Sequence, residues 1–480
     1  MIRAQPLIVQ TVRVFPALIL VAAAIGVAGF LLADPERSPV EPRLPGEGPP
    51  QPALTSAATS SLSEPERHAF DTPVPAMTGR WPNFRGPDRN AVAPASPPLA
   101  RQWPEGGPPV LWTVEMGEGY AGAAVWNGRV FVLDYDAERR ADVIRCLSLA
   151  TGDDIWRYAY PVVVKRQHGM SRTIPATDGR YVVTLGPKCH VTCLDAETGN
   201  VRWSIDLVER YGTKVPQWYA GQCPVIDEGR AIIAPGASAL AIAVDCDTGE
   251  VLWETPNPKG WAMSHTSLLP MTVGDRRVYI YAAHGGVAAI DASDGRLLWQ
   301  STQWRVRMAT VPTPVDAGDG RVLFSGGYKS GSLMVQLEPD GEGLTHETLF
   351  RLTPAEFGSD QQTPVFYGDH FYGVLPAEHG AQLVCFDTSG RRAWASGYEN
   401  GFGLGPYIIA DGLLFVLDDY GVLTMAEATP EGFNVLDRAP AIPDGHDAWG
   451  PPAFVNGLMI VRDLTRMTCL DLRQSNGQRP

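Results

Sequence analysis

One short pattern recurs along this 480-residue chain and limits what the chain can fold into. It reads CLSLATGDDIW at 146–156, CLDAETGNVRW at 193–203, AVDCDTGEVLW at 243–253 and AIDASDGRLLW at 289–299, with a shorter form, CFDTSGRRAW, at 385–394. In every copy a tryptophan follows a glycine by four residues. Glycine adopts a positive φ in a turn without steric cost, and alternating residues on either side suit a pleated strand. The pattern therefore predicts a β-hairpin that ends on tryptophan.

A second pattern recurs in step with the first. A small turn precedes an apolar strand eight times, at 127–128, 178–179, 228–229, 275, 319–320, 368, 411–412 and 456–457. The copies are about 44 to 51 residues apart, and each unit reads as four short strands. Such units are typical of β-propeller blades. Helical repeats do not fit, because residues alternate with period two and no long amphipathic run appears. The sequence predicts an all-β, eight-bladed β-propeller of four-stranded antiparallel blades.

The two ends of the repeat region complement each other. Val110–Met116 reads as a fourth strand with its tryptophan, Trp112, but no complete blade precedes it. The last unit, 450–472, stops after its third strand. We expect the early strand to complete the last blade and so remove the exposed edges of a partial blade. Two units depart from the pattern: the fifth has Thr345 where tryptophan is expected, and the seventh, at 425–436, has no tryptophan.

The N-terminal residues have a different character. Val14–Ala33 is a run of twenty residues without charge, and Arg3 and Arg13 precede it. A helix of this length spans about 30 Å, enough to cross a bilayer, and the arginines favour a cytoplasmic N-terminus at 1–13. We predict one transmembrane signal-anchor helix at 14–33. The alternative is a signal peptide cleaved near 27–29. Both place the propeller outside the cytoplasm, and the first predicts a single-pass protein of the inner membrane with its propeller in the periplasm.

The composition changes again before the repeats begin. Residues 34–77 are rich in proline and are predicted to be a disordered linker. Residues 78–109 contain Trp81, Phe84 and Trp103 and are predicted to pack on the propeller rim. The propeller itself is expected to span 110–472 and to be followed by a C-terminal tail, 473–480.

The repeated D-x-x-T-G-x-x-x-W unit resembles the pyrroloquinoline-quinone-type (PQQ-like) propeller repeat, and this resemblance covers roughly 110–472. It implies that the tryptophan of each fourth strand packs between neighbouring blades. In this chain those residues are Trp112, Trp156, Trp203, Trp253, Trp299 and Trp394. Two branches share the repeat: quinoprotein dehydrogenases, which hold the quinone and Ca²⁺ in the central channel, and cofactor-free BamB-like envelope scaffolds.

Several features bear on which branch applies. The chain has neither the adjacent cysteines that many quinoprotein dehydrogenases place over the quinone nor a C-x-x-C-H haem motif. Four of its seven cysteines occupy the same slot of the repeat, which indicates a small buried residue rather than a disulfide framework. A net charge of −14 argues against nucleic-acid binding, which needs a basic surface.

The loops that lead into the first strand of each blade gather at one mouth of the ring, so their polar residues should converge there. We expect partner or ligand contacts from His168, Arg172, Trp218, Tyr219, Trp261, His265, Arg305, Arg307, Gln361, Gln362, His446 and Trp449. No catalytic residue and no metal ligand is predicted. Asp360, Asp444 and Asp447 lie in these loops, but their spacing does not define a Ca²⁺ site.

The sequence as a whole favours a membrane-anchored, monomeric propeller without a cofactor that binds protein partners in the cell envelope. One alternative is a dehydrogenase of alcohols or sugars that uses pyrroloquinoline quinone with Ca²⁺. Another is a carbohydrate-binding propeller with a tryptophan-rich mouth. The sequence names neither the partner nor the ligand.

Overall fold

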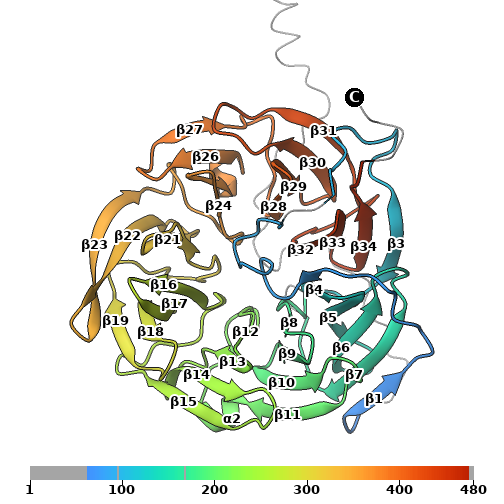
Figure 1. Cartoon of the computed structure of the whole chain (residues 1–480), viewed down its shortest axis with the longest axis horizontal. Coiled ribbons are helices and arrows are strands. Elements are labelled where there is room, and N and C mark those ends of the chain that lie inside the picture. Colours follow the sequence, from blue (N-terminus) through green and yellow to red (C-terminus); the bar gives the residue numbers. More distant parts are fainter. Residues whose placement is uncertain (1–61, 95–96, 167–168, 475–480) are drawn as a thin grey trace, which may run out of the picture. The chain divides into compact units, whose positions relative to one another are not determined.

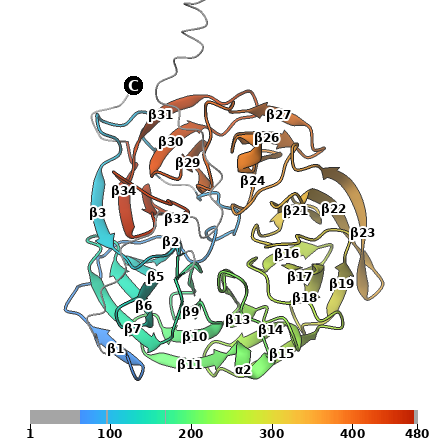
Figure 2. The ribbon, with the colours of Figure 1, turned by 180° about the vertical axis from the view of Figure 1, so that it is seen from behind.

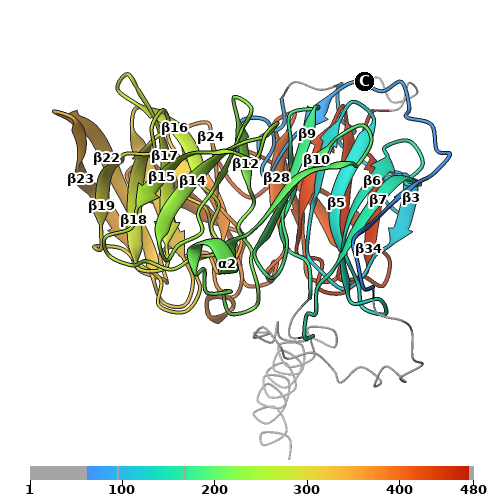
Figure 3. The ribbon, with the colours of Figure 1, turned by 90° about the horizontal axis from the view of Figure 1, so that it is seen from below.

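The computed structural model describes residues 62–94, 97–166 and 169–474, all within the unit Pro42–Pro480. These residues form a ring of eight antiparallel β-sheets around a central channel, so the predicted eight-bladed propeller is confirmed (Figure 1). Seen edge-on, the strands cross the thickness of the ring (Figure 3). The predicted transmembrane helix at 14–33 and the N-terminus before it lie outside the described residues. No helix in the described part of the chain is long and apolar enough to cross a bilayer.

Each blade places its first strand beside the channel and its fourth strand at the rim. The strands of the first blade, from the channel outwards, are β4 (Ala123–Trp126), β5 (Arg129–Asp136), β6 (Ala141–Ser148) and β7 (Asp154–Pro161). The second blade holds β8 (Ala176–Thr177), β9 (Tyr181–Leu185), β10 (His190–Asp195) and β11 (Val201–Asp206). The third holds β12 (Val225–Asp227), β13 (Arg230–Ile233), β14 (Ala239–Asp245) and β15 (Val251–Pro256). The fourth holds β16 (Leu269–Val273), β17 (Arg276–Ala283), β18 (Gly286–Asp291) and β19 (Leu297–Ser301).

The remaining blades follow the same order. The fifth holds β20 (Val315–Asp316), β21 (Arg321–Gly326), β22 (Gly331–Asp340) and β23 (Gly343–Leu352). The sixth holds β24 (Val365–Tyr367), β25 (His370–Val374), β26 (Leu383–Asp387) and β27 (Arg392–Ala395). The seventh holds β28 (Tyr407–Ala410), β29 (Leu413–Leu417), β30 (Val422–Glu427) and β31 (Val435–Pro440). The eighth holds β32 (Gly450–Val455), β33 (Leu458–Arg462), β34 (Arg466–Asp471) and β3 (Val110–Glu115). Two short helices, α2 (Leu207–Tyr211) and η1 (Ala377–His379), lie between strands.

The ring closes as predicted, because β3 pairs with β34 and supplies the outer strand of the eighth blade. A buried arginine reinforces this junction. Arg462, at the end of β33, is fully buried, and its guanidinium donates to the carbonyl oxygens of Ala121, Leu133 and Gly117 at 3.0, 3.2 and 2.9 Å. All three carbonyls belong to the first blade or to the loop before it. The last blade is therefore joined to the first by a strand and by a buried side chain.

The repeated tryptophans connect each blade to the next. The indole of Trp156 on β7 lies against Gly199, in the turn that follows β10, and its Nε1 donates to Ala196 O at 3.3 Å. A Cβ on Gly199 would lie 2.6 Å from the indole ring, and its φ of 70° also favours glycine. Gly152, Gly199, Gly249 and Gly295 each contact the tryptophan of the preceding blade in this way. Equivalent Nε1 bonds run from Trp112 to Leu149 O, from Trp203 to Cys246 O, from Trp299 to His346 Nδ1 and from Trp394 to Thr429 O. Trp253 lies against Gly295 in the same way, but its Nε1 finds no acceptor among the described residues.

The two irregular blades fill this position differently. In the fifth blade the residue opposite Met334, where the register shifts, is Phe350, and its ring lies against Gly390 of the next blade. The expectation that Thr345 takes the tryptophan position is therefore wrong, because β23 is ten residues long and the equivalent residue comes later. In the seventh blade the position falls on Asp437, whose carboxylate accepts from the backbone N–H of Trp103 at 2.6 Å.

The predicted linker, 34–77, extends too far along the chain. Its later residues form β1 (Glu66–Ala69), which pairs with the outer edge of β7 as a fifth rim strand of the first blade. Leu62 N donates to Arg139 O at 2.9 Å, and Arg139 forms an ion pair with Glu66 at 2.7 Å. β1 satisfies backbone groups that an unpaired edge of β7 would leave to solvent. The proline-rich composition of 34–77 did not indicate that β1 would pair with β7.

The prediction that 78–109 packs on the rim is wrong for its first half. β2 (Arg80–Trp81) pairs with β4, and residues 80–93, here called the channel segment, run through the centre of the ring (Figures 1 and 2). Arg85 is buried and donates to Thr363 O and Pro364 O of the sixth blade, both at 2.8 Å. Arg89 donates to Ile226 O of the third blade, and Val92 bridges to Ile409 of the seventh. Arginine donors and the carbonyls of inner strands together hold this segment in the channel.

A buried carboxyl group lies between the first two blades. Asp142 on β6 is fully buried, and one of its oxygens accepts from the hydroxyl of Tyr160 while the other has no hydrogen-bond partner among the described residues. Burial, reinforced by Asp134, raises the pKa of Asp142 to about 7. The group is therefore easier to ionise in the unfolded chain than in the ring.

Asp142→Asn is expected to flatten the pH dependence of stability. The pKa of Asp142 in the folded protein lies above its unfolded value of about 3.9. Its contribution to the free energy of unfolding is therefore fully present below pH 4 and is lost as the pH rises to about 7. The parent should lose on the order of 2 kcal/mol of unfolding free energy between pH 5 and pH 8 through this group, and the variant should not. Urea unfolding at several pH values measures the difference. Equal slopes in both proteins would contradict the assignment.

Candidate functional site

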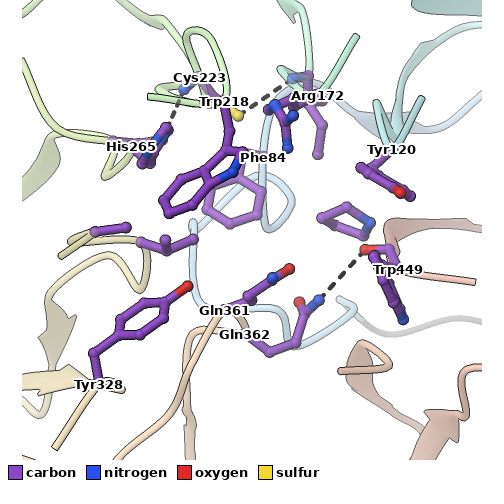
Figure 4. Close-up of a pocket in the computed structure, with 16 residues that line it drawn as sticks. Phe84, Tyr120, Arg172, Trp218, Cys223, His265, Tyr328, Gln361, Gln362 and Trp449 are labelled. Atoms are coloured by element: carbon purple, nitrogen blue, oxygen red, sulfur yellow. Dashed lines mark hydrogen bonds between the residues drawn. The ribbon is translucent and has the colours of Figure 1, made fainter. Parts of the chain in front are cut away.

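A pocket opens at the mouth formed by the loops that lead into the first strands, and it encloses about 820 Å³ counted out to the open mouth (Figure 4). Its walls come from the loops and strands of every blade except the seventh. Phe84 of the channel segment also lines it. The channel segment, which runs through the centre of the ring, therefore supplies part of the pocket wall.

Six of the twelve predicted mouth residues line this pocket: Arg172, Trp218, His265, Gln361, Gln362 and Trp449. Five of the other six lie elsewhere. Tyr219 and Trp261 are buried within the loops, Arg305 and Arg307 are exposed outside the pocket, and His446 lies 3.2 Å from the carboxylate of its neighbour Asp447. His168 lies outside the described residues.

Ten of the sixteen lining residues were not predicted as mouth residues, and these include Phe84, Tyr120, Cys223 and Tyr328. Cys223 belongs to a chain of hydrogen bonds that links neighbouring blades around the channel. In each bond a backbone N–H donates to a side chain of the next blade. Ile174 N donates to Cys223 Sγ at 3.2 Å, and Cys223 N donates to Ser267 Oγ at 3.0 Å. Ser267 N donates to Thr313 Oγ1 at 3.2 Å, and Thr313 N donates to Thr363 Oγ1 at 2.9 Å. A repeated triplet of Cys or Thr, Pro and Val, at 223, 313 and 363, is the sequence signal for this ring.

Trp218 occupies a turn position that seldom carries a large side chain. Tyr219 N donates to Pro216 O at 2.9 Å, and Trp218, the third residue of this turn, has a φ of 64°. That position favours glycine. The hydroxyl of Tyr219 fixes the loop, because it accepts from Lys165 N at 2.8 Å and donates to Lys165 O at 2.7 Å. The indole of Trp218 projects into the pocket that Phe84 also lines (Figure 4).

Tyr328 has the same peculiarity two blades further along the ring. It lies in the hairpin between β21 and β22, where Ser330 N donates to Gly327 O at 3.0 Å. Both central residues have positive φ, 52° at Tyr328 and 64° at Lys329, as in a type I′ turn that normally carries Asn-Gly. Tyr328 N donates to Asp360 Oδ1 at 3.3 Å, and burial raises the pKa of Asp360 to about 6.

The charge in the pocket comes from one arginine. Burial lowers the pKa of Arg172 to about 10, which leaves it protonated at neutral pH, and its guanidinium carbon lies 5.9 Å from the ring centre of Tyr120. Burial and then the charge of Arg172 lower the pKa of His265 to about 3, so its imidazole is neutral. Tyr120 and Trp449 form an aromatic pair with ring centres 5.0 Å apart.

The residues of this pocket do not fit a quinone held with Ca²⁺. Calcium takes six to eight oxygen ligands, chiefly from carboxylates. None of the described lining residues is an aspartate or glutamate, and the described part of the chain contains no group of three His, Cys, Asp or Glu placed to hold a metal. Phe84 and Arg85 also occupy the channel in which the resembling dehydrogenases hold their cofactor.

Comparisons with known proteins agree with the fold. The model of the family described as "Outer membrane protein assembly factor BamB" matches residues 139–387. Outer membrane protein assembly factor BamB of Yersinia pestis is 24% identical over 239 residues, which is 46% of this chain and 56% of that protein, so the chain spans about half the length of this relative.

Two solved structures show the likeness in space. The crystal structure of BamB from Moraxella catarrhalis superimposes with a TM-score of 0.55 at 14% identity, covering 76% of this chain and 99% of that chain. A quinohemoprotein alcohol dehydrogenase, ADHIIG from Pseudomonas putida HK5, has a TM-score of 0.45 at 14% identity and covers 85% of each chain. The likeness to the first concerns the fold alone.

Proposed function

Because this chain belongs to the family described as "Outer membrane protein assembly factor BamB", we propose that it is an envelope scaffold that binds protein partners through its propeller. The relative from Yersinia pestis carries the same name, which supports a role in the assembly of outer-membrane proteins. The observation that carries the proposal is the channel segment. It fills the centre of the ring with residues of the chain itself, where a catalytic propeller would hold its cofactor.

The proposal includes an anchor and a compartment. The uncharged run at 14–33, preceded by Arg3 and Arg13, holds the protein in the inner membrane with the propeller on the periplasmic side. The propeller acts as a monomer. Its acidic net charge of −14 gives nucleic acid no basic surface to bind.

Exposed apolar side chains on the rim strands offer contact points for a protein. Val201 on β11, Leu252 on β15 and Leu349 on β23 are 38%, 46% and 41% exposed. Each stands on the fourth strand of its blade, whose outer edge is open to another chain. The proposed protein interface therefore lies on the rim strands and does not use the residues of the pocket.

Site-specific photo-crosslinking of the full chain in native envelopes tests the proposal. With a photoreactive residue at 201, 252 or 349, we expect discrete adducts with one envelope protein from at least one position. The same label at Lys329, in the pocket-side hairpin, is the matched control and should not give that adduct. Uniformly absent adducts, or the same pattern from every position, would contradict a specific rim interface.

A second measurement separates the scaffold from a dehydrogenase. We expect the full chain to show no saturable thermal stabilisation by pyrroloquinoline quinone with Ca²⁺. A ligand at a hundred times its dissociation constant would add about 2.7 kcal/mol of stability, which differential scanning detects. A dose-dependent shift together with quinone-dependent oxidation of an alcohol or sugar, lost in Arg172→Ala, would overturn this part of the proposal.

A further inference from the structure

Three polar groups that line the pocket make no hydrogen bond within the described part of the chain: the indole N–H of Trp218, the amide of Gln361 and the hydroxyl of Tyr328. The adjacent Gln362, by contrast, donates to Leu404 O at 3.0 Å and to Trp449 O at 3.3 Å. The hydroxyl of Tyr328 and the amide of Gln361 both point into the pocket, which the indole of Trp218 enters from another blade (Figure 4). Partly buried groups of this kind gain free energy when a ligand supplies their partners.

Two of these three residues stand on strained backbone. Trp218 and Tyr328 occupy turn positions where glycine or asparagine relieves the strain, and both side chains enter the same pocket from different blades. Such strain is typically retained where a side chain is needed for function. The coincidence of strain and unused hydrogen-bonding capacity points to a ligand site at this place.

The groups also define the chemistry of the ligand. The faces of Trp218 and Phe84 offer flat apolar surfaces, and the three polar groups are neutral. Together they supply an N–H donor, a hydroxyl that both donates and accepts, and an amide that does both. A sugar ring presents the matching features, because one face carries C–H groups that pack on an aromatic ring and its edge carries hydroxyls that donate and accept.

We propose that the pocket binds a neutral saccharide by the sugar ring at its end. The channel segment runs through the centre of the ring and supplies part of the pocket wall, which suits a terminal sugar better than a chain that runs through. This site is separate from the rim interface and does not depend on it.

Titration of the full chain with cellobiose, maltose and N,N′-diacetylchitobiose tests the proposal by calorimetry and tryptophan fluorescence. We expect saturable binding of at least one of them. Trp218→Gly, Tyr328→Asn and Gln361→Ala should each weaken that binding roughly tenfold or more, the range for losing a hydrogen bond and a stacking face.

The substitutions are chosen so that loss of binding cannot be confused with loss of folding. Glycine at 218 and asparagine at 328 suit the positive φ of these turns, so both variants should melt at or above the parent temperature. Lys329→Gly relieves the same hairpin but keeps the aromatic ring, and Gln102→Ala removes an exposed glutamine outside the pocket; both should bind as the parent does.

Three results would overturn the proposal: no binding of any of the three disaccharides, binding that is unchanged in all three pocket variants, or tighter binding of glucuronate than of glucose. The last would assign the pocket to an anion.

Discussion

Replacing β3 by a glycine–serine stretch of equal length is expected to destabilise the ring by more than about 5 kcal/mol and to make it aggregate. The change removes Trp112, which is buried against the first blade, and a six-residue ladder. Loss of a buried aromatic side chain alone costs about 3–5 kcal/mol, and the bare edge of β34 becomes available to other chains. Chemical unfolding and light scattering measure the two effects.

Moving the strand provides the control. In a second variant Val110–Glu115 follows Asp471 through a copy of the turn Ala196–Asn200, so that β34 recovers its partner from the other end of the chain. This variant should regain most of the lost stability and stay monomeric. A glycine–serine variant that melts like the parent and stays monomeric would refute closure by β3.

Trp156→Ala should cost about 3–5 kcal/mol of unfolding free energy, the range for truncating an aromatic residue in a core. Its side chain is only 1% exposed, and the change empties the space between the first and second blades while leaving Ala196 O without its donor. Urea unfolding measures the loss. Trp394→Ala is the matched comparison and should cost less, because Trp394 is partly exposed.

The facing glycine tests the same contact from the other side. A Cβ at Gly199 would press on the indole and also strain a backbone with φ of 70°, so Gly199→Ala should be destabilising as well. In Trp156→Ala the steric part of that penalty should disappear. If the two effects instead add in the double variant, the tryptophan and the glycine do not act as a pair.

The repeat made most of the ring predictable. The Gly-to-Trp step marks the turn and the strand that meet between blades, and the truncated last unit required a strand such as β3 from elsewhere. The position of Phe350 could not be found this way, because β22 and β23 are longer than other strands and the register shift that aligns Phe350 with the tryptophans depends on pairing.

The channel segment was beyond the reach of the sequence. Nothing in residues 80–93 indicates a partner, since the bonds from Arg85 reach residues 278 and 279 positions away. Only half of the predicted mouth residues line the pocket, because the direction of a side chain also depends on structure that the sequence pattern does not show. Loops that lead into first strands do converge, but each side chain's direction depends on its turn, and Tyr328 enters from a hairpin of the second and third strands instead.

The closure by β3 sets an order of events during synthesis. Thr113 and its neighbour on β34, Thr468, are 355 residues apart, so β3 has emerged long before the strand it pairs with exists. At roughly 5–20 residues per second the wait is on the order of 20 to 70 s. During that time the blades between them can form from local contacts, while the junction must await the final residues. Joining first and last blades is therefore the closing step of folding, and until then an unpaired strand and an open ring edge are exposed to other chains.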